Sequence, residues 1–308
     1  MEMLISFRDH MLENDRSPIT IKGYLSDISQ FSRWFEQTNG EPFSLTVVTP
    51  SDVREYRAFL QTIERRKANT INRHLAALAS LYNWALETSQ VESDPTQKIR
   101  GINVGESGPH YLDKKQQYAL QRAIERDIQV SKMRYPKRWI VRRRDGSLAL
   151  FLQHTGLRLQ EALSLRLSDI QLTDRKGSVL VRYGKGHKER TVPLNADVRK
   201  NLNDWLTVRP TNRGDYLWMA VEKQAGCSLS SRSAERILQR IGQEAGLDRL
   251  TPHMLRHTFG KNLIDSGVSI EKVAQLMGHN NLNTTGIYVK PGPKDLEDAV
   301  EKIATAED

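Results

Sequence analysis

Hydrophobic residues in the first part of the chain recur at the spacing of a helix. Four of them fall at the i, i+4, i+7 and i+11 positions of one helix face: Tyr24, Ile28, Phe31 and Phe35. Ser17 supplies a capping hydroxyl just before this stripe, and Pro18 suits the first turn of a helix. The pattern therefore predicts a helix that begins at about residue 18.

Two further helices follow by the same reasoning. Thr49 and Pro50 repeat the start signal, and the stripe behind them consists of Val53, Tyr56, Leu60 and Ile63. Asn69 opens the next helix, whose apolar side is formed by Ile71, Leu75, Leu78, Tyr82 and Ala85. Residues 1–93 contain helical patterns only, so we expect a small four-helix domain there.

The apolar periodicity stops over residues 94–110, where glycine and proline accumulate. This composition is typical of a linker, and we place the domain boundary there. The second domain, 111–308, opens with Asp113, and Gln116 three residues later completes a capping-box pattern. The helix behind it carries an apolar stripe of Leu120, Ile124 and Ile128.

The second domain mixes helices with a little β-structure. A helix is expected from about Asp145 to His154, ending at Gly156. Residues 178–183 and 189–193 are β-rich runs joined by a basic turn, which predicts a hairpin. Further helices are predicted at about 195–207, 230–245, 251–264, 269–277 and 293–304. The fold class is therefore mainly α with a small antiparallel β-hairpin, and the second domain is α+β.

Composition narrows the possible partners. Of the 308 residues, 46 are Lys or Arg and 37 are Asp or Glu, and the formal net charge of +9 favours a polyanionic partner over acidic lipid. The chain has no run of eighteen apolar residues and no signal-peptide layout, and its mean hydropathy is −0.58, so we expect a soluble intracellular protein with no membrane partner. The single cysteine, Cys227, excludes an internal disulfide and fits a reducing cytoplasm.

One set of residues has the chemistry needed to cut a phosphodiester. It comprises two arginines, two histidines and a tyrosine: Arg158, Arg256, His253, His279 and Tyr288. A phosphate diester repels a nucleophile until fixed cations and donors neutralise its non-bridging oxygens. Guanidinium forks suit that task because they meet two oxygens at once and stay charged.

Local spacing supports this grouping. His253 and Arg256 lie three residues apart on a helix whose start is set by Thr251 and Pro252, so both side chains project from one face near an N-terminus that attracts phosphate. Glu161 lies one turn after Arg158. It either orients a side chain of the site, Arg158 or a neighbouring histidine, or it forms a salt bridge with a purely structural role.

These residues occur in runs that resemble the tyrosine recombinases, the phage-integrase family, and in particular its simple two-domain Xer-like members. The runs are Thr155-Gly-Leu-Arg158 with Glu161, Gly184-Lys185-Gly, His253-x-x-Arg256, Gly278-His279 and Tyr288. The resemblance implies that residues 1–93 form a four-helix SAM-like domain, which binds the core DNA site. It also implies a catalytic domain over 111–308 that ends in an interaction helix.

The family resemblance also implies roles. Tyr288 becomes the nucleophile that forms a 3′-phosphotyrosine bond, and a nearby base or cationic field must activate its phenol. His253 or His279 could supply the base. Lys185 becomes the acid that protonates the leaving alkoxide, although spacing alone leaves Lys188 and His187 open. His257 follows Arg256 but points about 100° away around the helix. We therefore expect it either to contact the catalytic side chains without touching the phosphate, or to have a structural role.

No metal or other cofactor is expected. The phosphotyrosine stores the energy of the broken diester, so a 5′-hydroxyl can reverse the reaction without ATP. The sequence contains neither a phosphate-binding Gly-x-x-x-x-Gly-Lys loop nor an acidic cluster suited to two-metal catalysis.

Several polar residues are candidates for contacts with duplex DNA. Candidates to read the major groove lie on one helix in each domain. They are Asn69, Asn72, Arg73 and His74 in the first domain, and Arg232, Arg236 and Arg240 in the second. A basic stretch at 132–144, which includes Arg143 and Arg144, is either a solvated face or a contact to the DNA backbone.

The last segment, 293–308, carries two lysines against three aspartates and three glutamates, which is unusual for a surface that faces DNA. In the family this helix packs into a neighbouring protomer, and the alternative is packing on its own domain. The expected partners are therefore a duplex target site and either identical subunits in a synaptic tetramer or a second, paired recombinase. The expected compartment is the prokaryotic cytoplasm or nucleoid.

Three functions fit these residues. The first is a site-specific recombinase. The second is a relaxing enzyme like the type IB topoisomerases, which would act as a monomer without site choice. The third is a non-catalytic DNA-binding accessory protein, which predicts a broken catalytic set, whereas every member of the set is present.

Overall fold

We describe the protein from a computed structural model, in which residues 2–104, 108–182, 189–211, 214–220, 226–278 and 283–286 are described. The chain divides into two compact units, Met1–Glu106 and Ser107–Asp308. Each unit has its own hydrophobic core. In the described part of the chain, no helix has the length and apolar character that crossing a membrane requires.

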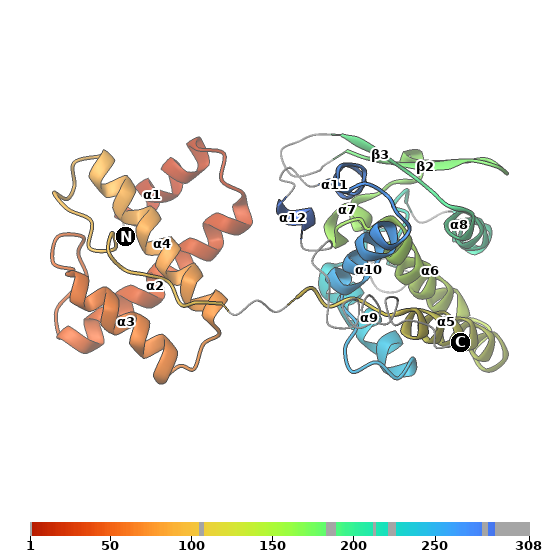
Figure 1. Cartoon of the computed structure of the whole chain (residues 1–308), viewed down its shortest axis with the longest axis horizontal. Helices are drawn as coiled ribbons and strands as arrows, with labels where there is room; N and C mark the ends of the chain where they lie inside the picture. The colour runs from red at the N-terminus through yellow and green to blue at the C-terminus, as the bar shows by residue number, and fades with distance from the viewer. Residues whose placement is uncertain are drawn as a thin grey trace, which may run out of the picture. The chain divides into compact units, whose positions relative to one another are not determined.

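The first unit consists of helices α1 (Glu2–Glu13), α2 (Pro18–Asn39), α3 (Pro50–Thr62) and α4 (Ala68–Glu87) (Figure 1). The Ser17 and Thr49 side chains accept hydrogen bonds from the backbone amides of Thr20 and Asp52, so both predicted caps are present. The fourth helix begins one residue before the predicted Asn69. The four-helix prediction is confirmed.

The core of this unit is rich in aromatic residues. Phe31, Phe35 and Tyr56 are buried, and the Phe31 and Tyr56 rings meet edge to face with centroids 5.0 Å apart. One predicted core position is wrong: Ile63 is 71% exposed. Ile63 is the C-cap residue that follows the last residue of α3. The helix has ended there, so the helical spacing no longer directs this side chain toward the core.

The second unit is mainly helical. Its longer helices are α5 (Lys114–Arg134), α6 (Trp139–Thr155), α8 (Ala196–Val208), α9 (Ser231–Glu244) and α10 (Pro252–Asp265). Three shorter ones are α7 (Leu159–Ser164), α11 (Ile270–Met277) and α12 (Asn283–Gly286), and a 3₁₀ turn spans Leu167–Asp169. Helix α6 contacts α5, α8, α9 and α10, so it forms the centre of the unit (Figure 1).

Helix α6 starts earlier than the expected residue 145. The missed turns, residues 139–144, end in the basic run of Arg142, Arg143 and Arg144, which breaks the apolar stripe. Arg144 is buried there and pairs with Asp145. Gly146 explains the close approach of α5, since a Cβ at this position would lie 2.5 Å from Ile124 Cγ2. These polar residues hid the first turns of the helix from a prediction based on hydrophobic spacing.

A three-stranded antiparallel sheet packs in the same unit, in the order β1 (Ile170–Leu172), β2 (Gly177–Val181), β3 (Arg190–Pro193). Strands β2 and β3 pair with Val179 opposite Val192, which confirms the predicted hairpin. Strand β1 was not predicted, because three residues are too short to display an alternating pattern. The basic turn between β2 and β3 lies outside the described residues.

The segment between the units is attached at both ends. On the first unit, the Asn72 side chain exchanges two hydrogen bonds with the Ile102 backbone, and Ile99 packs against the core. On the second unit, Leu112 is buried and its amide donates to Thr258 Oγ1 at 2.9 Å. Ile99 and Ile102 therefore belong to the first unit, and Leu112 belongs to the second.

Candidate active site

The turn between α6 and α7 places Arg158. Gly156 ends α6 with a left-handed backbone (φ 62°), and a Cβ at this residue would lie 2.3 Å from Phe259 Cδ1, so the turn depends on glycine. Arg158 then has an extended backbone and immediately precedes α7. The prediction that a break at Gly156 lets the Arg158 helix begin is confirmed.

Glu161 fixes the orientation of Arg158. Its carboxylate accepts from the Arg158 backbone amide at 2.9 Å and from Nη1 at 2.9 Å. Glu161 itself is buried. The two expected roles of Glu161, to orient Arg158 and to form a salt bridge, are therefore fulfilled by the same contact.

Arg190, on β3, is a second partner of Glu161 that the sequence did not reveal. Its Nη2 lies 2.7 Å from Glu161 Oε2 and its Nη1 lies 3.2 Å from Oε1, a two-pronged contact. Burial raises the pKa of Glu161, but the hydrogen bonds from Arg190 and Arg158 outweigh that effect and lower the pKa below its usual range. Glu161 therefore stays ionised between two arginines.

Arg256 comes from α10, whose start is set by Thr251: the threonine hydroxyl accepts from the Met254 amide at 3.2 Å. The Arg256 side chain is buried. Its Nη1 donates to the Gly156 carbonyl, and its Nη2 donates to the Met277 carbonyl at 2.7 Å. Arg256 is thus held by the turn before Arg158 and by the end of α11.

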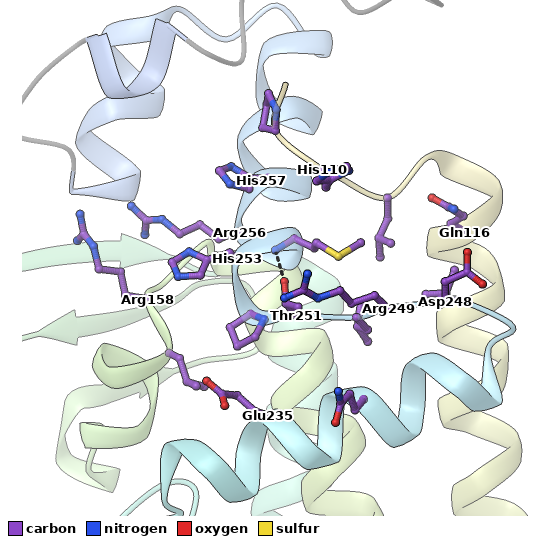
Figure 2. A pocket seen from close by; sticks show the side chains of 18 of the residues that line it. His110, Gln116, Arg158, Glu235, Asp248, Arg249, Thr251, His253, Arg256 and His257 are labelled. Atoms are coloured by element: carbon purple, nitrogen blue, oxygen red, sulfur yellow. Dashed lines mark hydrogen bonds between the residues drawn. The ribbon is translucent and has the colours of Figure 1, made fainter. Parts of the chain in front are cut away.

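Arg158, Arg256 and His253 lie together at one end of a groove, as Figure 2 shows. The groove has a volume of about 1120 Å³. Its other walls come from α9, from the loop before α10 and from the segment before α5, with the charged or polar side chains of Arg232, Glu235, Arg236, Asp248, Arg249 and His110. His253 is exposed in this groove, so it can reach a ligand.

His257 lies one turn beyond His253, with ring centroids 6.5 Å apart. Burial lowers its pKa to about 4, and the nearby charges of His253, Arg256 and His110 act in the same direction. His257 is therefore a neutral imidazole near pH 7. It cannot add to the positive charge that Arg158 and Arg256 supply.

Three predicted site residues, Lys185, His279 and Tyr288, lie outside the described residues, as do Lys188 and His187. Gly278, which precedes His279 in the sequence, is described: it ends α11 with a left-handed backbone (φ 66°), and its carbonyl accepts from Arg158 Nη2 at 3.0 Å. The residue before His279 is therefore in direct contact with Arg158.

The residues predicted to bind DNA from the first unit have different surroundings. Asn69 and Arg73 are exposed on α4, whereas His74 is buried. The Arg73 guanidinium also pairs with the buried Asp27 at 3.1 Å. Asn72 uses both atoms of its amide on the Ile102 backbone, so its contact is internal to the protein.

In the second unit, Arg232 and Arg236 are exposed and line the groove. Arg240 is not among the lining residues and pairs instead with Asp127 and Asp145. Arg143 pairs with Asp204 at 2.6 Å, and its side chain is 17% exposed. Arg144 is buried, where it pairs with Asp145 and donates to the Met219 carbonyl. Both guanidinium groups are thus engaged within the protein, Arg143 with Asp204 of α8 and Arg144 with Asp145 and Met219.

The fold and the site define a class of protein. It is mainly helical and has two units, and in the second unit two arginines and a histidine converge on an open groove. A sequence profile of the "Phage integrase family" matches residues 124–294, and one of the "Phage integrase, N-terminal SAM-like domain" matches residues 4–88. The chain belongs to the phage integrase family, as its motifs suggested.

Named relatives match over nearly the whole chain. The "TnP I resolvase" of Bacillus thuringiensis is 27% identical over 310 residues, covering 98% of this chain and 100% of the relative. Tyrosine recombinase XerC of Corynebacterium glutamicum is 29% identical over 304 residues, covering 97% of this chain and 91% of the relative.

Solved structures share the fold. The XerH site-specific recombinase, bound to its palindromic difH substrate in a post-cleavage complex, aligns with a TM-score of 0.74 and 25% identity over 92% of this chain and 79% of that chain. The Tn1549 transposon integrase in complex with a circular intermediate DNA aligns with a TM-score of 0.70 over 98% of this chain and 99% of that chain. Its 16% identity carries the likeness of fold alone.

Proposed function

We propose that this chain is a site-specific DNA recombinase that cleaves and rejoins strands through a 3′-phosphotyrosine intermediate. The observation that carries the proposal is the convergence of Arg158 and Arg256 beside His253 at the end of an open groove (Figure 2). Two guanidinium groups and one imidazole are suited to the charge that develops on a phosphodiester under attack. The family membership and the names of the relatives point the same way.

In the proposed reaction, Arg158, Arg256 and His253 bind the non-bridging oxygens of the scissile phosphate. The Tyr288 hydroxyl attacks phosphorus and gives its proton to a base, His253 or His279, while the bond to the 5′-oxygen breaks. Lys185 protonates that oxygen. A 5′-hydroxyl of a second strand then attacks the phosphotyrosine bond and restores a diester, so the bond energy is conserved.

The groove is the proposed seat of duplex DNA. The exposed basic side chains of Arg232, Arg236 and Arg249 also line this groove, and the net charge of +9 suits a polyanion. On the first unit, Asn69 and Arg73 are the candidates for the corresponding contact. The proposed partners are a duplex target site and further subunits, either identical or of a second recombinase, in a synaptic tetramer within the prokaryotic cytoplasm.

A plasmid assay tests this proposal against the two alternatives. The target site is first selected from random-sequence duplexes by binding, and two copies are placed in a supercoiled plasmid. We expect exchange between the copies and no change in a plasmid without them. Relaxation of the plasmid that lacks sites, without exchange, would identify an enzyme like the type IB topoisomerases. Binding without any cleaved or exchanged product would identify an accessory protein.

A further inference from the structure

The C-terminal end of α11 is held by three arginines from three different parts of the second unit. Three successive backbone carbonyls each accept from a different guanidinium: Leu276 from Arg190 Nε at 3.3 Å, Met277 from Arg256 Nη2 at 2.7 Å and Gly278 from Arg158 Nη2 at 3.0 Å. The last carbonyls of a helix lack partners within the helix and carry its partial negative charge, so cations are favourable there.

Arg190 differs from the other two arginines in its position. Its side chain is 13% exposed, and it is not among the described residues that line the groove, whereas Arg158 and Arg256 are. A phosphate in the groove would therefore meet Arg158 and Arg256, with Arg190 behind them on Glu161.

Gly278 is matched to Arg190. A Cβ at Gly278 would lie 2.7 Å from Arg190 Cζ, and the left-handed backbone of this residue favours glycine as well. The absence of a side chain thus lets the guanidinium sit against the end of α11 while it holds Glu161 with its other edge.

The charges give this arrangement a second consequence. Glu161 carries one negative charge and pairs with two positive arginines, Arg158 and Arg190. The three side chains together therefore have a net charge of about +1. Without Arg190, Glu161 would be left with Arg158 alone, and the positive charge that Arg158 presents to a phosphate would be cancelled. Arg190 therefore influences both the orientation and the field of Arg158.

We propose that Arg190 is a positioning residue for strand cleavage, which fixes Arg158 through Glu161 and fixes the end of α11 through Leu276. It would not contact DNA. This inference rests on the proposed recombinase function, and it assigns to a strand residue a part in setting the site. A purely structural ion pair is the alternative.

The decisive variant is Arg190→Lys. Lysine keeps the charge beside Glu161, but one ammonium cannot replace a guanidinium that grips both carboxylate oxygens and donates to Leu276 at once. We expect the folded protein to bind its duplex site with unchanged affinity and to form the covalent adduct on a nicked duplex at least about tenfold more slowly, since small displacements of a positioned group cost about that much or more.

The matched control is Arg209→Lys. Arg209 is also buried and donates to backbone carbonyls, of Pro210, Gly214 and Tyr216, but it does not line the groove or contact Glu161. We expect it to lower the unfolding midpoint while the adduct rate of the folded protein stays at the wild-type value. A loss of rate common to both variants would make Arg190 merely structural.

A double-mutant cycle tests the route through Glu161. In a Glu161→Gln background, the Arg190→Lys change should slow the adduct much less than it does alone, because the shared carboxylate is already gone. Equal slowing in both backgrounds, or a wild-type rate for folded Arg190→Lys, would overturn the inference. A wild-type protein that forms no adduct at all would instead overturn the proposed function, and with it this inference.

Discussion

The buried side chain of Arg256 donates a hydrogen bond from Nη1 to the carbonyl of Gly156, two residues before Arg158. One contact therefore joins the helix that carries Arg256 to the turn that presents Arg158. The two arginines that converge on the groove are positioned by the same joint, although they are far apart in the sequence.

This joint predicts different costs for removing each arginine. Arg256→Ala leaves the carbonyls of Gly156 and Met277 without their donor, and a buried unsatisfied group costs about 1–3 kcal/mol. Arg158 is more exposed, with 33% of its side chain accessible, so Arg158→Ala should cost less stability. Both variants should reduce strand cleavage by about 10²–10³-fold, as expected for lost charge stabilisation. Urea unfolding and single-turnover cleavage would measure the two effects separately, and equal loss of stability would argue against the joint.

Gly156→Ala tests the turn itself. The substitution forces a Cβ into a left-handed residue and against Phe259, so we expect a loss of unfolding free energy beyond the roughly 1 kcal/mol typical of a left-handed glycine alone. Gly40→Ala is the matched control, because Gly40 also ends a helix with a left-handed backbone (φ 73°) but a Cβ there would meet nothing within 4 Å. The prediction fails if the two variants lose the same stability by chemical denaturation.

His257 should titrate far from its ordinary range. Its pKa is lowered from 6.5 to about 4, so between these values the unfolded chain binds a proton at this ring and the folded chain does not. Stability linked to His257 is therefore present above pH 6.5 and is lost as the pH falls toward 4. NMR titration of labelled histidine rings would give the pKa directly. We expect His253→Ala to raise the His257 pKa but to leave it below 6.5, since burial remains the larger cause. A pKa of 6.5 or more in the intact protein would contradict this account.

The groove arginines should contribute to DNA affinity through phosphates. Arg232→Ala and Arg236→Ala should each weaken binding and reduce the slope of log K against log salt by about 1. Arg143→Ala should leave the slope unchanged, because its guanidinium is already paired with Asp204. Filter binding over a series of salt concentrations would separate these variants, and an equal effect of all three would remove the distinction between groove and ion pair.

Much of the fold could be predicted because local signals carry it. The caps at Ser17, Thr49 and Asp113 and the glycine at 156 each act through their own backbone neighbours, so spacing along the chain reveals them. The start of α6 could not be predicted in this way, because Arg144 and Asp145 satisfy each other inside the core and break the hydrophobic stripe.

The site shows the same division. Arg158, His253 and Arg256 belong to short motifs whose spacing is meaningful within one turn or one helix. Arg190 lies 29 residues from Glu161 and reaches it only because β3 folds beside α7 and α11, a relation that no local spacing encodes. A lone arginine on a strand gives no signal until its partner is known.

The most direct test of the recombinase account is the covalent adduct. Purified protein is mixed with duplexes of its selected site that are nicked at successive positions, and the products are separated under denaturing conditions. We predict a detergent-stable protein–DNA adduct with the wild-type chain and none with Tyr288→Phe, while both proteins bind the intact duplex equally. An adduct that persists in Tyr288→Phe, or its absence from a wild-type protein that binds the site, would contradict the account.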